Sequence, residues 1–150
     1  MTRIAGNQNA VFSQGGEDGI IDTIFEQIGT TDKVYVEFGV EDCTQCNSRY
    51  LREHKGWDTK NSLLMDGGNS NPEINLKKVI FWPHNIVCLF ETFQVKKKFD
   101  FLSVDTDIYD FFILEAILKA GYRPRVIAIE INARSVLKIT TFYLFYSSNF

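Results

Sequence analysis

The chain has 150 residues, of which 45% are hydrophobic and 14% aromatic, and its formal net charge at pH 7 is −3. This length and apolar content suffice for one globular domain with its own core. Its one basic cluster, Lys96-Lys97-Lys98, is too short for a phosphate-tracking surface, so we expect no nucleic-acid partner. Residues 1–11 lack the apolar core of a signal peptide, and no apolar run approaches the roughly 18 residues that span a bilayer. We therefore expect a soluble, cytoplasmic protein with no membrane partner.

The first half of the chain predicts two helices and two strands. Apolar residues recur at helical spacing over 17–28, and Gly29 follows where a left-handed helix cap is wanted. The β-branched and aromatic run 34–38 predicts a strand. Residues 48–54 predict the next helix, and the apolar run 62–66 predicts a second strand that stops at a glycine-rich turn.

The second half continues the same alternation. Its predicted elements are helices over 72–78, 86–93 and 108–120 and strands over 79–82, 99–105 and 125–131. Strands that alternate with helices need right-handed crossover connections, which give a mostly parallel sheet covered on both faces. We therefore predict an α/β, Rossmann-like fold with about five strands.

The three cysteines include one CxxC motif, Cys43 and Cys46. Their odd number suits a reducing compartment better than a disulfide framework. No second pair follows the motif, and His54 and His84 stand at no familiar zinc spacing. We expect a loop of small thiols, with a structural zinc site as the alternative.

Carboxylates stand at or next to the ends of four predicted strands, at Glu37, Asp66, Asp105 and Glu130. The carboxyl ends of parallel strands meet at one edge of a sheet, where α/β folds bind ligands. An acid after a strand can also simply cap the next helix. Four acids together favour a ligand cleft over four independent caps.

The turn after the first strand, Gly39-Val40-Glu41-Asp42-Cys43, has one glycine and two adjacent acids instead of GxGxxG. A pyrophosphate about 4 Å from either acid would be repelled by about 1 kcal/mol per charge pair in water and about 4 at an effective dielectric of 20. S-adenosylmethionine carries a sulfonium and an ammonium and no phosphate, and Asp66 stands where an acid can accept from the ribose diol. We therefore expect S-adenosylmethionine rather than NAD or ATP.

Several motifs in order resemble a known group. VEFG at 36–39, LMD at 64–66 and LSVD at 102–105 resemble motifs of class I methyltransferases. More specifically, the chain is similar to FkbM-like methyltransferase domains through SQGGEDG at 13–19, NSRYL at 47–51, MDGG at 65–68 and DTDIYD at 105–110. The first motif departs from the class by lacking its later glycines. The resemblance covers 13–132, between an N-terminal arm at 1–12 and an atypical tail at 133–150.

The resemblance implies S-adenosylmethionine-dependent methyl transfer, with O-methylation of a small-molecule or carbohydrate-type acceptor. Glu37 and Gly39 would meet the methionyl part of the cofactor, Asp66 its ribose, and Asn85 and Ile86 its adenine edge. The full implied cofactor-binding set is Glu37, Phe38, Gly39, Asn47, Asp66, Gly67, Asn85, Ile86 and Asp105. Asp105 and Asp107 would face the acceptor as the candidate catalytic residues, and no metal is implied.

Two other interpretations stay open. An apolar strand followed by Asp105-Thr106-Asp107 also matches the metal-binding DxD of nucleotide-sugar glycosyltransferases and, loosely, the aspartate motif of haloacid-dehalogenase-type phosphatases. Glu130 and Asn132 would complete such a site. The third interpretation is an inactive methyltransferase-like binding domain.

The C-terminal residues differ from what the resemblance implies. A complete class I fold has seven strands, and residues 132–150 have room for one edge strand but hardly for two and a helix. We therefore hypothesise a truncated product with an exposed sheet edge that is prone to pairing or aggregation.

Overall fold

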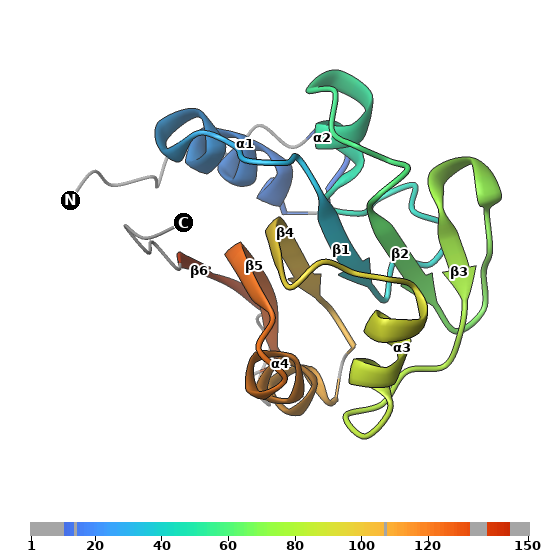
Figure 1. The fold of residues 1–150 in the computed structure, drawn as a ribbon. Helices are drawn as coiled ribbons and strands as arrows, with labels where there is room; N and C mark the ends of the chain where they lie inside the picture. Colours follow the sequence, from blue (N-terminus) through green and yellow to red (C-terminus); the bar gives the residue numbers. More distant parts are fainter. Residues whose placement is uncertain (1–10, 14, 107, 133–137, 145–150) are drawn as a thin grey trace.

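The computed structural model describes residues 11–13, 15–106, 108–132 and 138–144. These residues form a sheet with strand order β3-β2-β1-β4-β5-β6, in which the first five strands are parallel and β6 runs antiparallel to β5 (Figure 1). The elements are α1 (Glu17–Ile28), β1 (Tyr35–Phe38), α2 (Arg49–His54), β2 (Leu63–Asp66), a 3-10 turn (Pro72–Ile74), β3 (Leu76–Lys78), α3 (Ile86–Thr92), β4 (Lys98–Val104), α4 (Asp110–Lys119), β5 (Arg123–Asn132) and β6 (Lys138–Leu144). The predicted α/β class with a mostly parallel sheet is confirmed.

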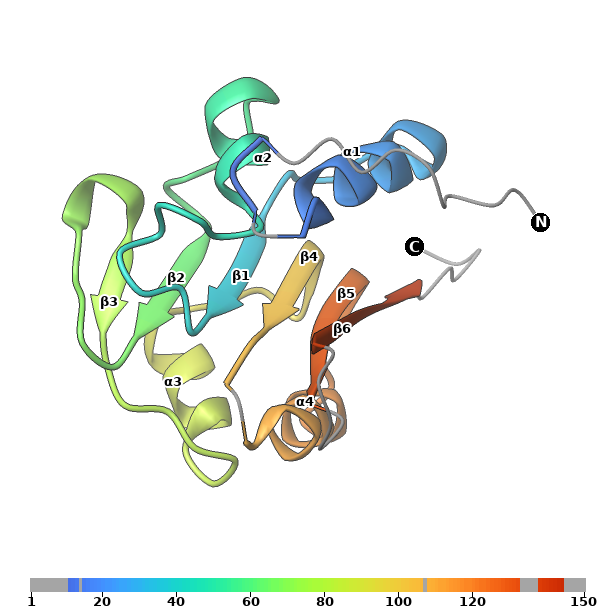
Figure 2. The same ribbon diagram turned by 180° about the vertical axis from the view of Figure 1, so that it is seen from behind.

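The central strands are buried on both faces, as crossover helices require. Successive side chains of a strand point to opposite faces, so Tyr35 packs with α1 and α2 while Val36 and Phe38 pack with α3 and α4. Figures 1 and 2 show the same division, with α1 and α2 on one side of the sheet and α3 and α4 on the other. Burial is therefore uninterrupted along β1, along β2 as far as Met65 and along β4 after Lys98.

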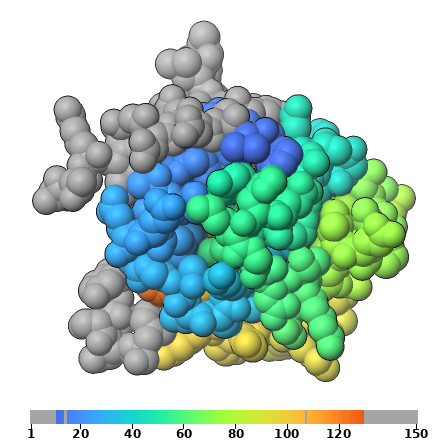
Figure 3. All heavy atoms as spheres, turned by 90° about the horizontal axis from the view of Figure 1, so that it is seen from above, coloured from blue at the N-terminus to red at the C-terminus, as the bar shows by residue number. Residues whose placement is uncertain are grey.

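The face that carries α1 and α2 also holds the first described residues of the chain. The Phe12 ring stacks on His54 of α2 at 5.7 Å between centroids, and the Arg49 guanidinium lies 4.1 Å over the same ring. The space-filling view of this face shows the segment beside α2 (Figure 3). The SQGGEDG motif therefore starts a helix whose preceding residues are packed against the domain.

The third strand lies earlier in the chain than predicted. Residues 72–78 were expected to form a helix, but only Pro72–Ile74 makes a 3-10 turn, which ends where Asn75 takes φ 55°. Leu76 is buried and pairs with Leu64, so β3 begins there. The apolar run 79–82 was expected to be the strand, yet it lies outside the sheet, with Ile80 63% exposed.

The last described segment adds a strand to the sheet. Residues 138–144 pair with 126–132 of β5 in antiparallel register. The sheet therefore extends past residue 132, into the part that the sequence assigned to an atypical tail. Among the described residues, none of the helices is long and apolar enough to cross a membrane.

Candidate functional site

The sheet has one point where the direction of its connections reverses. β1 lies between β2 and β4. The chain leaves β1 toward α2 on one face and leaves β4 toward α4 on the other. The loop 39–48 after β1 and the loop that begins at Asp105 after β4 therefore lead from the carboxyl edge to opposite faces, and doubly wound sheets bind ligands at such an edge.

Three predicted site residues stand at the same level of this edge. Phe38 pairs with Met65 on one side and with Val104 on the other. The next residue of each strand is therefore Gly39, Asp66 or Asp105. The strand register brings these three positions together, and the sequence predicted this edge for Asp66 and Asp105.

Gly39 permits a close approach between two loops. Its φ is 73°, and its amide donates to the Met65 carbonyl oxygen at 3.1 Å. A methyl group at this position would overlap the Asp105 carbonyl oxygen. Glycine is therefore required both by the backbone conformation and by the contact between the β1 and β4 loops.

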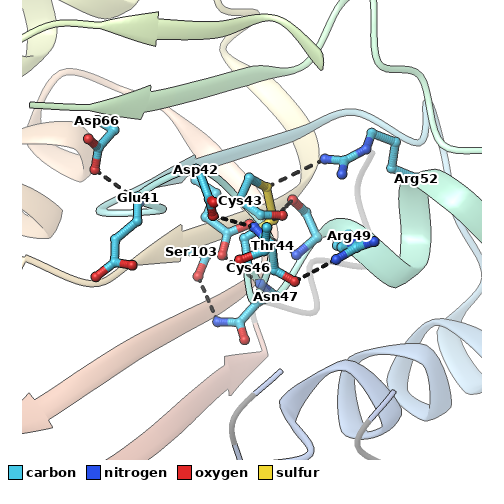
Figure 4. Close-up of a disulfide and its surroundings, with 12 residues drawn as sticks. Glu41, Asp42, Cys43, Thr44, Cys46, Asn47, Arg49, Arg52, Asp66 and Ser103 are labelled. Atoms are coloured by element: carbon cyan, nitrogen blue, oxygen red, sulfur yellow. Dashed lines mark hydrogen bonds between the residues drawn. A yellow bond between two sulfur atoms is a disulfide. The ribbon is translucent and has the colours of Figure 1, made fainter. Parts of the chain in front are cut away.

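Asp66 ties the loop after β1 to the turn after β2. Its Oδ2 accepts from the Glu41 amide at 3.0 Å (Figure 4), and its Oδ1 accepts from the Gly68 and Asn69 amides at 2.7 and 2.9 Å. Gly67 lies within the same turn. Because a carboxylate oxygen has two acceptor positions, Oδ2 keeps capacity beyond the Glu41 amide.

Glu37 points away from the edge, toward α2. The alternation along β1 places it on the same face as Tyr35, where it is 4% exposed. Its Oε1 accepts from the Asn47 amide at 2.8 Å and its Oε2 from the Ser48 amide at 3.0 Å, just before α2 begins. Burial raises the pKa of Glu37, although hydrogen bonds from Ser48 and Asn47 oppose the shift. Glu37 therefore has the helix-start role that the sequence left open for each acid.

Asn47 connects the β1 loop to β4. Its amide donates to Glu37, and its side-chain Nδ2 donates to Ser103 Oγ at 3.1 Å (Figure 4). Ser103 lies two residues before Asp105 and is buried. Asn47 thus lies at the predicted site, and its side chain holds the end of loop 39–48 against the strand that precedes Asp105.

Three other predicted cofactor residues serve the core or a turn. Phe38 and Ile86 are fully buried among the core residues on the α3 and α4 face. Asn85 accepts from the Trp82 amide at 2.7 Å and donates to the Ile80 carbonyl at 3.1 Å. Phe38 and Ile86 are therefore core residues, and the half-buried Asn85 fixes the turn before α3.

The loop after β4 contains the candidate catalytic residues. Asp105 is partly buried, and Asp107 lies outside the described residues. Asp110, at the start of α4, accepts from the amide and hydroxyl of Thr106 at 2.6 and 2.8 Å, which fixes the beginning of this loop. In the described part of the chain, no group of three or more His, Cys, Asp or Glu side chains is placed to hold a metal ion.

An aromatic pair that the sequence did not single out connects two loops of the same edge. Trp82 and Tyr109 pack edge to face with centroids 5.3 Å apart, and they are 41% and 37% exposed. Trp82 belongs to the apolar run that resembled a strand, which concealed its surface position. The pair gives the edge an apolar, partly exposed surface beside its acids.

Cys43 and Cys46 form a disulfide, contrary to the expected free thiols or zinc site (Figure 4). Cys43 takes φ 62°, and its amide donates to the Val40 carbonyl oxygen at 2.7 Å. This tight turn brings the two Cα atoms to 4.8 Å, within the range that a disulfide spans. The CxxC spacing was the available signal for it.

The exposed part of the site is acidic. Glu41 and Asp42 are both exposed on the β1 loop. Hydrogen bonds from the Thr44 hydroxyl and amide lower the pKa of Asp42, so it is ionised at neutral pH. With Asp66 and Asp105 at the same edge, the arrangement suits a cationic ligand better than a phosphate.

Comparisons of the chain with protein-family models, with curated proteins and with solved structures find no match in any of the three. A functional assignment therefore depends on the residues of the carboxyl edge themselves.

Proposed function

We propose that this domain binds S-adenosylmethionine at the β1–β4 edge and transfers its methyl group to a small-molecule or carbohydrate-type acceptor. The observation that carries the proposal is the register of Gly39, Asp66 and Asp105 at this edge, with the acidic loop residues Glu41 and Asp42 beside them. The resemblance to FkbM-like methyltransferase domains supports the same assignment.

The charges favour this cofactor over a dinucleotide. Opposite charges attract and like charges repel, and solvent screening weakens both effects at exposed positions. Glu41 and Asp42 therefore attract the sulfonium and ammonium of S-adenosylmethionine, and they repel a pyrophosphate. Asp66 Oδ2 retains acceptor capacity for a ribose hydroxyl in addition to the Glu41 amide.

The protein's task in methyl transfer is mainly positioning. When bound, the cofactor supplies an activated methyl carbon for an in-line displacement by the acceptor oxygen. Asp105, held next to Gly39, and Asp107 are the residues we propose to orient the acceptor hydroxyl and take its proton. Trp82 and Tyr109 offer the acceptor an apolar surface at the same edge.

Calorimetric titration of the whole chain tests the cofactor assignment. We expect S-adenosylmethionine to bind, NAD to bind at least about tenfold more weakly, and Asp66→Asn to weaken S-adenosylmethionine by about tenfold or more, which is 1.4 kcal/mol. Asp58→Asn is the matched control, because Asp58 likewise accepts from a turn, at Asn61, but lies before β2 at the opposite end of the strand. Equal binding of NAD, or no S-adenosylmethionine binding by the folded chain, would contradict the proposal.

Turnover separates the enzyme from the inactive binding domain. With an acceptor identified by transfer of a labelled methyl group, Asp107→Asn should lower kcat and leave cofactor affinity within about threefold, as expected for a group that acts on the acceptor. Cofactor binding without transfer to any carbohydrate-type hydroxyl would favour the inactive domain.

A further inference from the structure

The Cys43–Cys46 disulfide lies in loop 39–48, between the candidate site and α2 (Figure 4). A disulfide stabilises a fold mainly by restricting the unfolded chain, and the effect grows with the length of the closed loop. With a sequence separation of 3, this ring restricts very little chain. A purely structural role therefore accounts poorly for it, whereas closely spaced CxxC pairs are common at redox-active sites.

We propose that Cys43 and Cys46 form a reversible thiol–disulfide exchange site that locks loop 39–48 when oxidised and releases it when reduced by a dithiol. This proposal does not depend on the identity of the cofactor. It concerns the loop that carries Glu41 and Asp42, whatever ligand these acids bind.

The loop backbone is held in an unfavourable conformation. Glu41 and Cys43 have φ values of 51° and 62°, in the left-handed backbone region that residues other than glycine rarely adopt. Such residues persist only where their surroundings fix them. Here the restraints are the Asp66 bond to the Glu41 amide, the Cys43 bond to Val40, and the disulfide. Opening the disulfide removes one restraint from a loop that contains two strained residues.

The surroundings of Cys43 favour its thiolate. Arg52 Nη1 on α2 lies 3.5 Å from Cys43 Sγ, and the Arg52 side chain is only 9% exposed. Glu53 Oε1 lies 3.5 Å from Arg52 Nη2 and shares its charge with Arg49 at 2.9 Å. A partly buried guanidinium at this distance stabilises a thiolate, so Cys43 is the better leaving group when the disulfide is attacked.

The exchange is a two-electron step. A thiolate of the dithiol attacks Cys46 Sγ, the Cys43–Cys46 bond breaks, and Cys43 leaves as a thiolate beside Arg52. The second thiolate of the dithiol then attacks the mixed disulfide and releases Cys46. The reductant becomes a cyclic disulfide, and its two protons pass through solvent to the cysteine thiolates. Both cysteines are buried, at 3% and 5% exposure, so attack requires the loop to open first.

The test combines thiol counting with hydrogen exchange on the whole chain, without cofactor. Cys88 is exposed and outside the disulfide, so it provides an internal reference thiol. In dithiothreitol redox buffers the folded protein should pass reversibly from one alkylated cysteine to three. Reduction should speed amide exchange in residues 40–48 by about tenfold, as expected when a local restraint is lost, and leave β4 unchanged.

Variants sharpen the outcome. The double variant Cys43→Ser, Cys46→Ser should exchange like the reduced protein in every buffer, and Cys88→Ser should behave like the wild type. Arg52→Ala should need about tenfold more reductant to reach the midpoint, whereas Arg52→Lys should stay near the wild type. A pair that is reduced only when the protein unfolds, that never oxidises in the folded chain, or whose reduction leaves exchange in 40–48 unchanged would overturn the proposal. None of these results bears on S-adenosylmethionine binding, so the two proposals fail separately.

Discussion

Arg125 on β5 donates to the Asp100 carboxylate on β4 at 2.9 Å, near the amino ends of these strands. Asp100 is fully buried and also accepts from the backbone amides of residues 31–33. Arg125 donates in addition to the carbonyl oxygens of residues 28 and 29. One ion pair therefore joins two central strands to the end of α1 and to the turn that leads into β1.

Removing the cation should destabilise the domain strongly. Arg125→Ala leaves the Asp100 carboxylate buried without its charge partner, and breaking a buried pair in this way costs about 3–5 kcal/mol. Urea unfolding followed by circular dichroism measures the loss. Lys119→Ala is the control, because it breaks the exposed Lys119–Glu115 pair, which should contribute about 0.5 kcal/mol or less. Equal losses in the two variants would show that the buried pair has no special weight.

Gly39→Ala should damage the candidate site through its backbone. An alanine in the left-handed conformation destabilises the fold by about 1 kcal/mol. Its methyl group also overlaps the Asp105 carbonyl oxygen. Gly56→Ala isolates the first effect, because Gly56 has φ 64° and no atom within 4 Å of the added carbon. We expect Gly39→Ala to lose about 1–3 kcal/mol more than Gly56→Ala in chemical unfolding, the usual range for overpacking. Similar losses would mean that the two loops separate at little cost.

The sequence predicted the fold class and the edge of the sheet at which acidic residues lie, because both depend on local patterns. Alternating strand and helix signals lead to a parallel sheet, and the turn residues that follow a strand mark its end. This sufficed to place Asp66 and Asp105 together, whereas Glu37, which was predicted with them, faces α2. Strand β3 was misplaced because its one buried residue, Leu76, gives a weaker signal than the apolar run 79–82, of which Ile80 and Trp82 are exposed.

Features that depend on three-dimensional partners could not be predicted. The direction of Glu37 follows from which face of β1 carries α2, and strand alternation alone does not choose the face. Asp100 and Arg125 are 25 residues apart, and only the β4–β5 register brings them together. The disulfide needed the left-handed turn at Cys43, which the residue type does not favour.

Asp18 should stabilise the fold only at pH values where its carboxylate is ionised. It is fully buried in the first turn of α1 and accepts from the amides of Val11, Phe12 and Ser13 and from the Ser13 hydroxyl. Burial raises the pKa of Asp18, but the hydrogen bonds from Phe12 and Ser13 outweigh it, and the net pKa is lowered. A lowered folded-state pKa stabilises the fold above the unfolded value, about 3.9, and this gain is lost as pH falls through the folded value.

The wild type should therefore lose more stability than Asp18→Asn between about pH 5 and about pH 3, because the variant has no carboxylate to protonate. Ser13→Ala, which removes one donor and keeps the charge, should give an intermediate slope. Denaturant unfolding across this range is the measurement. Parallel curves for the wild type and Asp18→Asn would show that the hydrogen bonds at Asp18 do not depend on its charge.

Glu37 should show the opposite dependence on pH. Its burial raises the pKa despite the hydrogen bonds from Ser48 and Asn47. The folded state then holds the proton more tightly than the unfolded chain, so the domain loses stability as pH rises from about 4.3, the ordinary glutamate value, through the folded-state pKa. Glu37→Gln carries no titrating group, so its stability relative to the wild type should increase across this window, even if the amide replaces only one of the two accepted hydrogen bonds.

Glu53→Gln provides the contrasting control for Glu37. Burial of Glu53 is slight, and pairing with Arg49 and Arg52 outweighs it and lowers the pKa. The wild type should therefore gain stability relative to Glu53→Gln as pH rises through the acid range. The two glutamates lie on either side of loop 39–48, so a movement of this loop with pH would change the stability of both variants, relative to the wild type, in the same direction. If the two relative stabilities instead change in opposite directions with pH, each effect belongs to its own carboxylate. That result would confirm that Glu37 is held inside the fold rather than at the exposed edge.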